Sequence, residues 1–173
     1  ILPDLLLGLI AETDGDLVEA ERRFTAVGVV SPRCYPARMG LARIEISRGN
    51  GSGALGYAEP MLQEINPSEG LYELLSRSYL TDGQTGLAAE YAVEAYKLVK
   101  EPRILVLQAQ IYLAVGNIPQ ASNLLTILEA RRSDDPEVWL LKAEVQANQD
   151  QLEDAIATIT QAQELFPDDG KIR

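Results

Sequence analysis

Few residues in this chain have the types and spacing that could carry chemistry. Histidine is absent, so the commonest general base and the commonest metal ligand are both missing. The single cysteine, Cys34, has no histidine to activate it, and we expect an inert or merely oxidisable thiol. One cysteine also excludes an internal disulfide and a zinc site built on thiolates. We therefore predict no catalytic residue, no cofactor and no metal.

The acidic clusters also have simpler explanations than catalysis. Asp14-Gly15-Asp16 contains oxygen ligands and a glycine, but its spacing does not fit a calcium-binding EF-hand loop, and a turn followed by a helix cap accounts for it. Asp134-Asp135 and Asp168-Asp169 fall between predicted helices, where acids stabilise helix N-termini. No glycine-rich phosphate-binding motif occurs.

The elements that would position any site come from an internal repeat. Alanine recurs at Ala20, Ala54, Ala88, Ala121 and Ala155, at intervals of 34, 34, 33 and 34 residues. A fixed period of this size is typical of stacked helical repeats. Aligned on these alanines at position twenty, the units run 1–34, 35–68, 69–101, 102–135 and 136–169, and 170–173 would begin a further unit or cap.

Other columns of the repeat predict two helices and a turn in each unit. Position eight is always small, and position fifteen is glycine in four units, as suits a turn with positive φ. The next residue is an N-cap type at Asp16, Asn50 and Asn117. Pro102 and Pro136 mark helix starts. No segment alternates with period two, so we expect no sheet.

The second unit departs from the pattern. Pro60 lies inside its second predicted helix, where a proline costs about 3 kcal/mol unless the helix bends, so we expect a kink or an early end there. The glycine-rich stretch Gly49-Asn50-Gly51-Ser52-Gly53 also predicts that this unit is the least tightly packed of the array.

These columns resemble the tetratricopeptide repeat family over essentially the whole chain. The last unit matches at Trp139, Ala143, Ala155, Ala162 and Pro167, and the first at Leu7, Gly8, Gly15, Ala20, Phe24 and Pro32. The resemblance implies an all-α, right-handed solenoid of five helix-turn-helix repeats, about ten antiparallel helices in a single array. Trp139, Tyr79 and Tyr112 then belong to the repeat core, and Glu45 departs from the usual aromatic.

The resemblance also implies a partner-binding concave groove lined by the first helices. The positions that face it are Leu5, Leu9, Met39, Arg43, Ile46, Glu73, Arg77, Leu80, Val106, Gln110, Leu113, Leu140 and Glu144. They describe an apolar floor with a central basic pair, Arg43 and Arg77, suited to a partner carboxylate. The alternative is that the apolar residues pack against neighbouring helices and the arginines are solvated.

The residues of the clamp that grips chaperone C-termini are missing, since Leu5, Leu9, Met39, Gly40 and Arg43 occupy those positions. An apolar groove favours an amphipathic helix or an extended apolar segment instead.

Charge and composition narrow the partners further. The net charge of −11 argues against nucleic acid and anionic membrane as partners. Leu5, Leu6, Leu7, Leu9 and Ile10 lack a preceding basic region and fit the repeat, so we interpret them as helix rather than signal peptide. No run is long enough to insert in a membrane. Arginine-rich composition favours a bacterial protein; cytoplasm and periplasm both stay open, with the periplasm favoured.

We therefore predict a non-catalytic protein-protein interaction scaffold that binds a partner peptide or helix, for example in a bacterial envelope, polysaccharide-export or secretion assembly. Two alternatives stay open: a self-associating homo-oligomer, and a substrate-recruiting arm of a larger enzyme. Because the chain starts at Ile1 inside a unit and runs into the register of another, we expect a piece of a longer protein.

Overall fold

The turn inside each repeat is where local sequence acts most directly on the fold. Gly15, Gly49, Gly83 and Gly116 have φ of 79°, 74°, 79° and 74°. Asp150, at the same position in the fifth unit, has φ of 62°. Side chains rarely adopt this left-handed conformation, which explains why the first four units use glycine. The prediction of a positive-φ turn at position fifteen is confirmed in all five repeats, including the fifth, where Asp150 replaces glycine.

The predicted caps and helix starts are also confirmed. Asp16 accepts a hydrogen bond from the Glu19 amide at 3.0 Å, and Asn50 accepts one from the Gly53 amide at 3.1 Å. Asn117 accepts one from the Gln120 amide at 3.4 Å. These side chains satisfy amides that have no partner inside the helix. Pro102 and Pro136 are the first residues of their helices.

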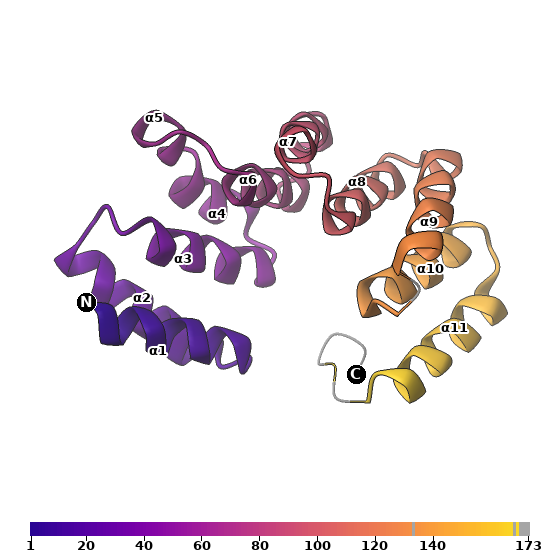
Figure 1. The fold of residues 1–173 in the computed structure, drawn as a ribbon, viewed down its shortest axis with the longest axis horizontal. Helices are drawn as coiled ribbons and strands as arrows, with labels where there is room; N and C mark the ends of the chain where they lie inside the picture. The colour runs from indigo at the N-terminus through magenta and orange to yellow at the C-terminus, as the bar shows by residue number, and fades with distance from the viewer. Residues whose placement is uncertain (133, 168, 170–173) are drawn as a thin grey trace. The chain divides into compact units, whose positions relative to one another are not determined.

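The computed structural model describes residues 1–132, 134–167 and 169, and they are all-α as predicted, with no strand. The chain divides into two compact units, Ile1–Leu98 and Val99–Arg173. The first contains α1 (Leu2–Thr13), α2 (Leu17–Val30), α3 (Tyr35–Ser47), α4 (Gly51–Ala58), α5 (Met61–Glu64), α6 (Glu69–Thr81) and α7 (Thr85–Leu98). The second contains α8 (Pro102–Ala114), α9 (Ile118–Arg132), α10 (Pro136–Asn148) and α11 (Leu152–Leu165) (Figure 1).

In the first unit, the helices pack as successive pairs. α1 pairs with α2, α3 with α4 and α6 with α7, while α3 also packs on α1 and α2, and α6 on α3 and α4. The repeating alanines lie inside these contacts, since Ala20, Ala54 and Ala88 have no exposed surface. A methyl side chain at this position therefore lets the two helices of a pair approach closely.

Phe24 on α2 fills the junction between the first two repeats. Its ring is fully buried and lies against two glycines, Gly8 on α1 and Gly40 on α3. A Cβ atom at Gly8 would be 2.7 Å from Phe24 Cε1, closer than van der Waals contact allows. Glycine at these two places thus makes room for one large aromatic side chain.

Pro60 breaks the second helix of the second repeat, as the sequence predicted. α4 ends at Ala58, and the short helix α5 continues from Met61 to Glu64. Arg38 on α3 secures this segment, because its guanidinium donates to both Glu64 carboxylate oxygens and to the Tyr57 carbonyl, each at 3.1 Å. The interruption at Pro60 therefore separates α4 from α5, and Arg38 attaches the segment to α3.

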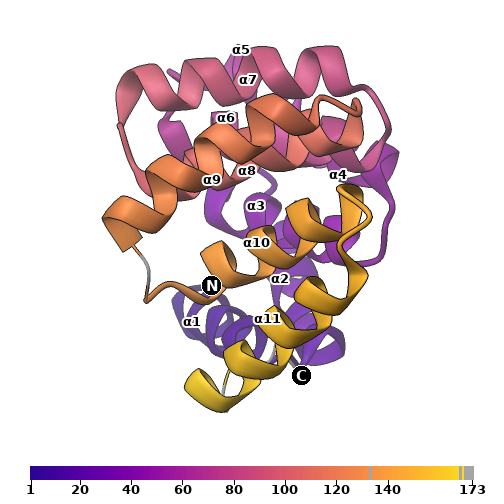
Figure 2. The ribbon, with the colours of Figure 1, turned by 90° about the vertical axis from the view of Figure 1, so that its right-hand side faces the viewer.

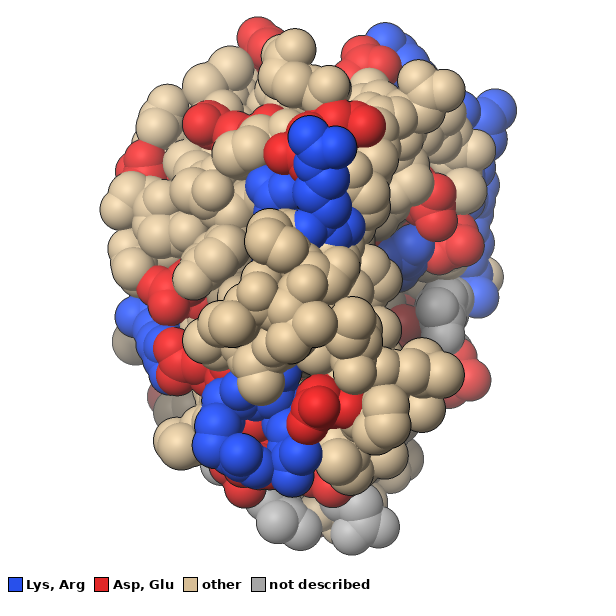
Figure 3. Space-filling model, turned by 90° about the vertical axis from the view of Figure 1, so that its left-hand side faces the viewer, with Lys and Arg blue, Asp and Glu red and all other residues tan. Residues whose placement is uncertain are grey.

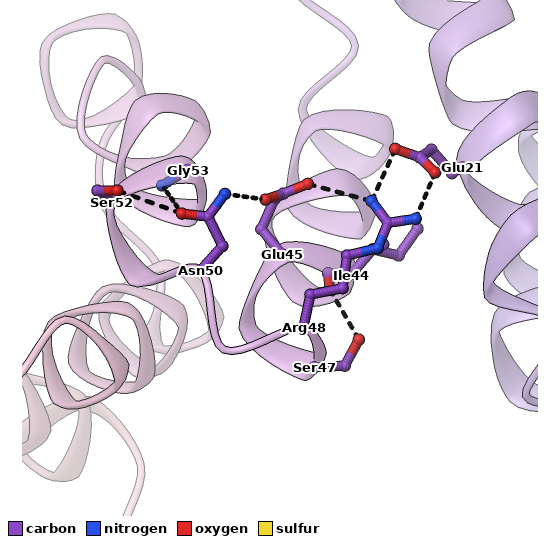
Figure 4. A network of polar contacts seen from close by, with 8 residues as sticks. All are labelled: Glu21, Ile44, Glu45, Ser47, Arg48, Asn50, Ser52 and Gly53. Carbon is purple, nitrogen blue, oxygen red and sulfur yellow. Dashed lines mark hydrogen bonds and ion pairs between the residues drawn. The ribbon is translucent and has the colours of Figure 1, made fainter.

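The glycine-rich stretch after α3 is better fixed than its composition suggests (Figure 4). Asn50 caps α4 and donates to Glu45, and Arg48 pairs with both Glu45 and Glu21 on α2. Gly51 is buried against the backbone of Asp82, where a Cβ atom would lie 2.3 Å from the Asp82 nitrogen. The expected loose turn is instead a capped helix start that needs glycine for close packing.

In the second unit, α8 pairs with α9 and α10 with α11, and α10 also packs on α8 and α9. Figure 2 shows α10 and α11 side by side. Ala121 is fully buried and Ala155 is 9% exposed. Trp139 does not belong to the core as expected: it is half-buried, with the Lys142 ammonium 5.7 Å from its ring. Tyr112 is likewise half-buried, whereas Tyr79 is buried.

Candidate interaction surface

The groove positions predicted for the first unit lie on α1, α3 and α6, and each is half-buried: Leu5, Leu9, Met39, Arg43, Ile46, Glu73, Arg77 and Leu80. Leu5 and Leu9 pack against the buried cluster that includes Phe24 and Leu41. The alternative interpretation, that groove positions also pack on neighbouring helices, thus applies to these two leucines. Met39, Ile46 and Leu80 are the remaining apolar positions of this face.

Arg43, one of the two predicted binding arginines, pairs with a carboxylate from the adjacent first helix. Its Nε and Nη2 donate to the two carboxylate oxygens of Glu12 on α1, at 2.5 and 2.7 Å. The Glu12 side chain is 18% exposed and that of Arg43 is 40% exposed. This two-point geometry fixes both side chains and ties α3 to α1.

Arg77 makes a similar contact within α6. Its Nε and Nη2 each lie 3.2 Å from Glu73 Oε1, one turn away. Each arginine therefore already has a carboxylate partner that compensates its charge. Figure 3 shows the same tendency on one side of the molecule, where blue Lys and Arg side chains lie beside red Asp and Glu.

The groove positions of the second unit differ in exposure. Gln110, Leu113 and Leu140 are half-buried and Glu144 is exposed, but Val106 is only 2% exposed. Val106 therefore offers almost no surface in this structure. Leu140 and Glu144 line an apolar hollow of about 590 Å³ on α10 and α11. Its other lining residues are Ala143, Ala147, Leu152, Ala155, Ile156, Ile159 and Thr160.

Glu144 is the polar member of this hollow, which we call the α10–α11 pocket. It faces solvent on one side, while burial against the apolar walls raises the pKa of its carboxyl above the usual value. A charged Glu144 therefore costs free energy in the folded chain, and covering the pocket with an apolar surface would increase that cost.

The residues that α11 contributes to this pocket were not among the predicted groove positions. Leu152 and Ile156 are 62% and 68% exposed on α11, although both are large and apolar. The sequence contained a hint, because Leu152 occupies position seventeen of its repeat and Ile156 follows the alanine at position twenty. In the first repeat, the residue at position seventeen, Leu17, packs in the cluster that contains α3 residues. That contact is visible only in the structure.

The remaining candidates for chemistry have structural roles. Asp16 and Asp135 cap helices, the latter accepting from the Glu137 amide at 3.0 Å. Cys34 is half-buried at the start of α3 and packs against the Phe24 cluster. Asp168 lies outside the described residues. Among the residues that are described, no group of three or more histidine, cysteine, aspartate or glutamate side chains could hold a metal.

Tyr79 is engaged in a buried aromatic cluster. Its hydroxyl contacts Glu59, and its ring stacks on Tyr91 at 5.4 Å between centroids. Burial and the Glu59 contact raise its pKa well above the usual value. These contacts account for the position of the Tyr79 side chain.

No helix in the described part of the chain is both long and apolar enough to span a bilayer. Residues 106–170 match the family model described as tetratricopeptide repeat. No curated protein matches the sequence. The fold is similar to the crystal structure of TTC0263, a thermophilic TPR protein in Thermus thermophilus, with a TM-score of 0.85 and 21% identity over 99% of this chain and 94% of that one.

Two further solved structures have similar folds at lower identity. PilW, a type IV pilus biogenesis factor, aligns with a TM-score of 0.74 and 16% identity over 99% of this chain and 80% of its own. YrrB, described as a TPR protein with an unusual peptide-binding site, aligns with a TM-score of 0.61 and 14% identity over 98% and 88%.

The helix pairs, the positive-φ turns and the buried alanine column define an all-α protein of helix-turn-helix repeats. With the family match and the similar structures, the predicted resemblance is confirmed: this is a chain of tetratricopeptide repeat fold.

Proposed function

We propose that this chain holds a segment of a partner protein, as a peptide or helix, on the face formed by α1, α3 and α6. The observation that carries the proposal is the row of half-buried apolar side chains on successive first helices, Met39, Ile46 and Leu80. Each keeps apolar surface in water, so a partner that covers the row gains binding energy.

The charged residues set the chemistry of the partner. Arg43 and Arg77 already form ion pairs with Glu12 and Glu73, so each pair contributes no net charge to this face. Exchanging a well-formed ion pair for another gains little free energy, whereas covering apolar surface is favourable. The partner we propose is therefore an amphipathic helix or an extended segment with apolar anchors.

The same proposal extends to the second unit and to the setting. There Gln110, Leu113 and Leu140 are the half-buried positions that a partner would contact. A bacterial envelope, polysaccharide-export or secretion assembly is the setting we propose. PilW, which has a similar fold, is described as a type IV pilus biogenesis factor, and this similarity of fold supports the proposal.

Site-specific photo-crosslinking tests this face. A photoreactive amino acid is placed at Met39, Ile46 or Leu80, with exposed Thr25 and Val29 on α2 as matched controls. We expect one shared crosslinked partner from the three face positions and its absence from the controls. The variant Met39→Glu with Ile46→Glu should lose that partner, and Val29→Glu should keep it. Equal crosslinking from face and control positions would exclude this face as the binding site.

A further inference from the structure

Asn50 and Gly51 form the one asparagine-glycine pair of this chain. In such a pair the backbone nitrogen of the glycine can attack the asparagine side chain, because no Cβ atom on the glycine hinders the approach. This reaction, deamidation, is one reason why asparagine is a thermolabile residue. Asn50 is exposed to water, so its local contacts, rather than burial, decide whether it reacts.

Deamidation passes through a succinimide ring, and water is its co-reactant. The Gly51 nitrogen forms a bond with Cγ of Asn50, and the bond from Cγ to Nδ2 breaks. The Gly51 amide proton passes through solvent to Nδ2, which leaves as ammonia. Water then opens the ring at either carbonyl carbon and gives aspartate or isoaspartate, in which the main chain runs through Cγ.

The backbone of Asn50 keeps the attacking nitrogen away from the side chain. The succinimide ring contains both the Gly51 nitrogen and Asn50 Cβ, so these atoms must lie on the same side of the Asn50 Cα–C bond. Asn50 has φ of −96° and ψ of 77°. Because the bonds at Cα are tetrahedral, this ψ places the Gly51 nitrogen nearly opposite Cβ. Ring closure therefore requires the peptide unit between the two residues to rotate by close to half a turn.

Three hydrogen bonds fix the Asn50 side chain as well (Figure 4). Its Oδ1 accepts from the Gly53 amide at 3.1 Å and from the Ser52 hydroxyl at 3.2 Å. Its Nδ2, the leaving group of the reaction, donates to a carboxylate oxygen of Glu45 on α3. Ring closure would break these bonds, so the cap of α4 also opposes the reaction.

Gly51 is fixed by the helix on its other side. It is buried, and a Cβ atom on it would lie 2.3 Å from the backbone nitrogen of Asp82, at the end of α6. A rotation beside so close a contact requires the start of α4 to move away from Asp82. We propose that Asn50 is a deamidation site that the fold protects, and that it reacts when the first turn of α4 opens.

The products do not restore the native junction. Isoaspartate adds a main-chain atom before Gly51, where the contact with Asp82 leaves no room. Aspartate still caps a helix well, but it lacks Nδ2 and the bond to Glu45. Deamidation thus turns a transient opening into a lasting change at the junction of α4 and α6. It involves none of the apolar side chains of the proposed partner face, so the proposal does not depend on the proposed function.

Peptide mapping by mass spectrometry tests the proposal on the full chain, because deamidation changes the mass of the peptide that contains Asn50. The wild type is incubated at one pH and temperature, both folded and unfolded in guanidinium chloride. We expect the folded chain to react at least about tenfold more slowly, because only its open fraction is reactive. Equal rates in the two states, or no reaction in the unfolded chain, would overturn the proposal.

Glu45→Ala tests the cap, since it removes the acceptor of the leaving group and leaves the reacting atoms unchanged. It should react several-fold faster than the wild type when folded and at the same rate when unfolded. Glu94→Ala on α7 is the matched control, because Glu94 pairs with Lys97 three residues on, as Glu45 does with Arg48. Circular dichroism checks that both variants remain helical. A folded Glu45→Ala chain that reacts no faster than this control would contradict the proposal.

The consequence for the fold is measured on chain that has reacted while unfolded and is then refolded. Its unfolding midpoint in urea should be lower than that of fresh chain, in proportion to the isoaspartate formed. Asn50→Ser is the control for the incubation, because serine caps a helix and cannot form the succinimide. An unchanged midpoint in the reacted wild type would show that the junction accepts the products, against the proposal.

Discussion

Gly40 on α3 lies directly against the ring of Phe24 on α2, so that a Cβ atom at Gly40 would be 2.3 Å from Phe24 Cε2. Gly8 lies on the other side of the ring, and Phe24 has no exposed surface. A methyl group added at either glycine would therefore overlap the ring. The first two repeats are joined by one aromatic side chain held between two glycines.

Gly40→Ala should therefore destabilise the chain, although alanine favours helix more than glycine does. Overpacking of this kind costs about 1–3 kcal/mol, which exceeds the propensity gain. Gly56→Ala in α4 is the matched control, since no atom lies within 4 Å of the added methyl, and it should be neutral or stabilise by up to about 1 kcal/mol. Urea unfolding measures both, and equal effects would contradict the close packing of Phe24.

The turn at position fifteen allows a reciprocal test. Gly83 has φ of 79° and open space around it, so Gly83→Ala should cost roughly 1 kcal/mol through backbone conformation alone. Asp150 carries the same strain at φ of 62°, and Asp150→Gly should remove part of it and stabilise by roughly 0.5 kcal/mol. Thermal unfolding of the two variants should shift in opposite directions. Shifts of the same sign would show that the turn conformation does not decide stability.

The repeat pattern explains why so much of this fold could be predicted from the sequence. Position fifteen requires a backbone conformation and position twenty requires a small side chain, and both requirements act on residue type directly. Pro60 acts in the same way, because a proline inside a helix removes a backbone hydrogen bond whatever its neighbours are. These features are local, so one sequence is enough to read them.

What could not be predicted depends on the neighbours of each side chain. Arg43 looked like a free cation, because sequence spacing does not show that Glu12, 31 residues earlier, lies within hydrogen-bonding distance. The contact of Arg77 with Glu73 could have been predicted, since the two residues are four apart on one helix. Trp139 stands at a core position of the family yet remains half-buried. The groove residues were derived from the same register, and their role in binding stays a prediction that the crosslinking experiment addresses.

The pairing of Arg43 with Glu12 predicts a measurable coupling between α1 and α3. Arg43→Ala and Glu12→Ala should each destabilise modestly, and the double variant should lose less than the sum of the two. We expect a coupling of about 0.5–1 kcal/mol, because the arginine remains partly exposed. High salt should reduce it. Additive single effects at low salt would mean that Arg43 is free for a partner.

Glu144 predicts a pH-dependent stability of known sign. Its pKa is raised in the folded chain, so the folded state binds a proton more readily than the unfolded state over the range between the two pKa values. The contribution of this group to stability therefore falls as pH rises from the unfolded value, near 4.5, through the raised folded value. Above that range the ionised carboxylate destabilises the fold.

Glu144→Gln should consequently be more stable than the wild type at pH 7, with a difference that disappears as the pH falls below 4.5. Chemical unfolding of both proteins across this pH range measures the difference. A Glu144→Gln variant that is less stable at pH 7 would mean that the carboxylate makes a favourable contact that outweighs its burial in the apolar pocket.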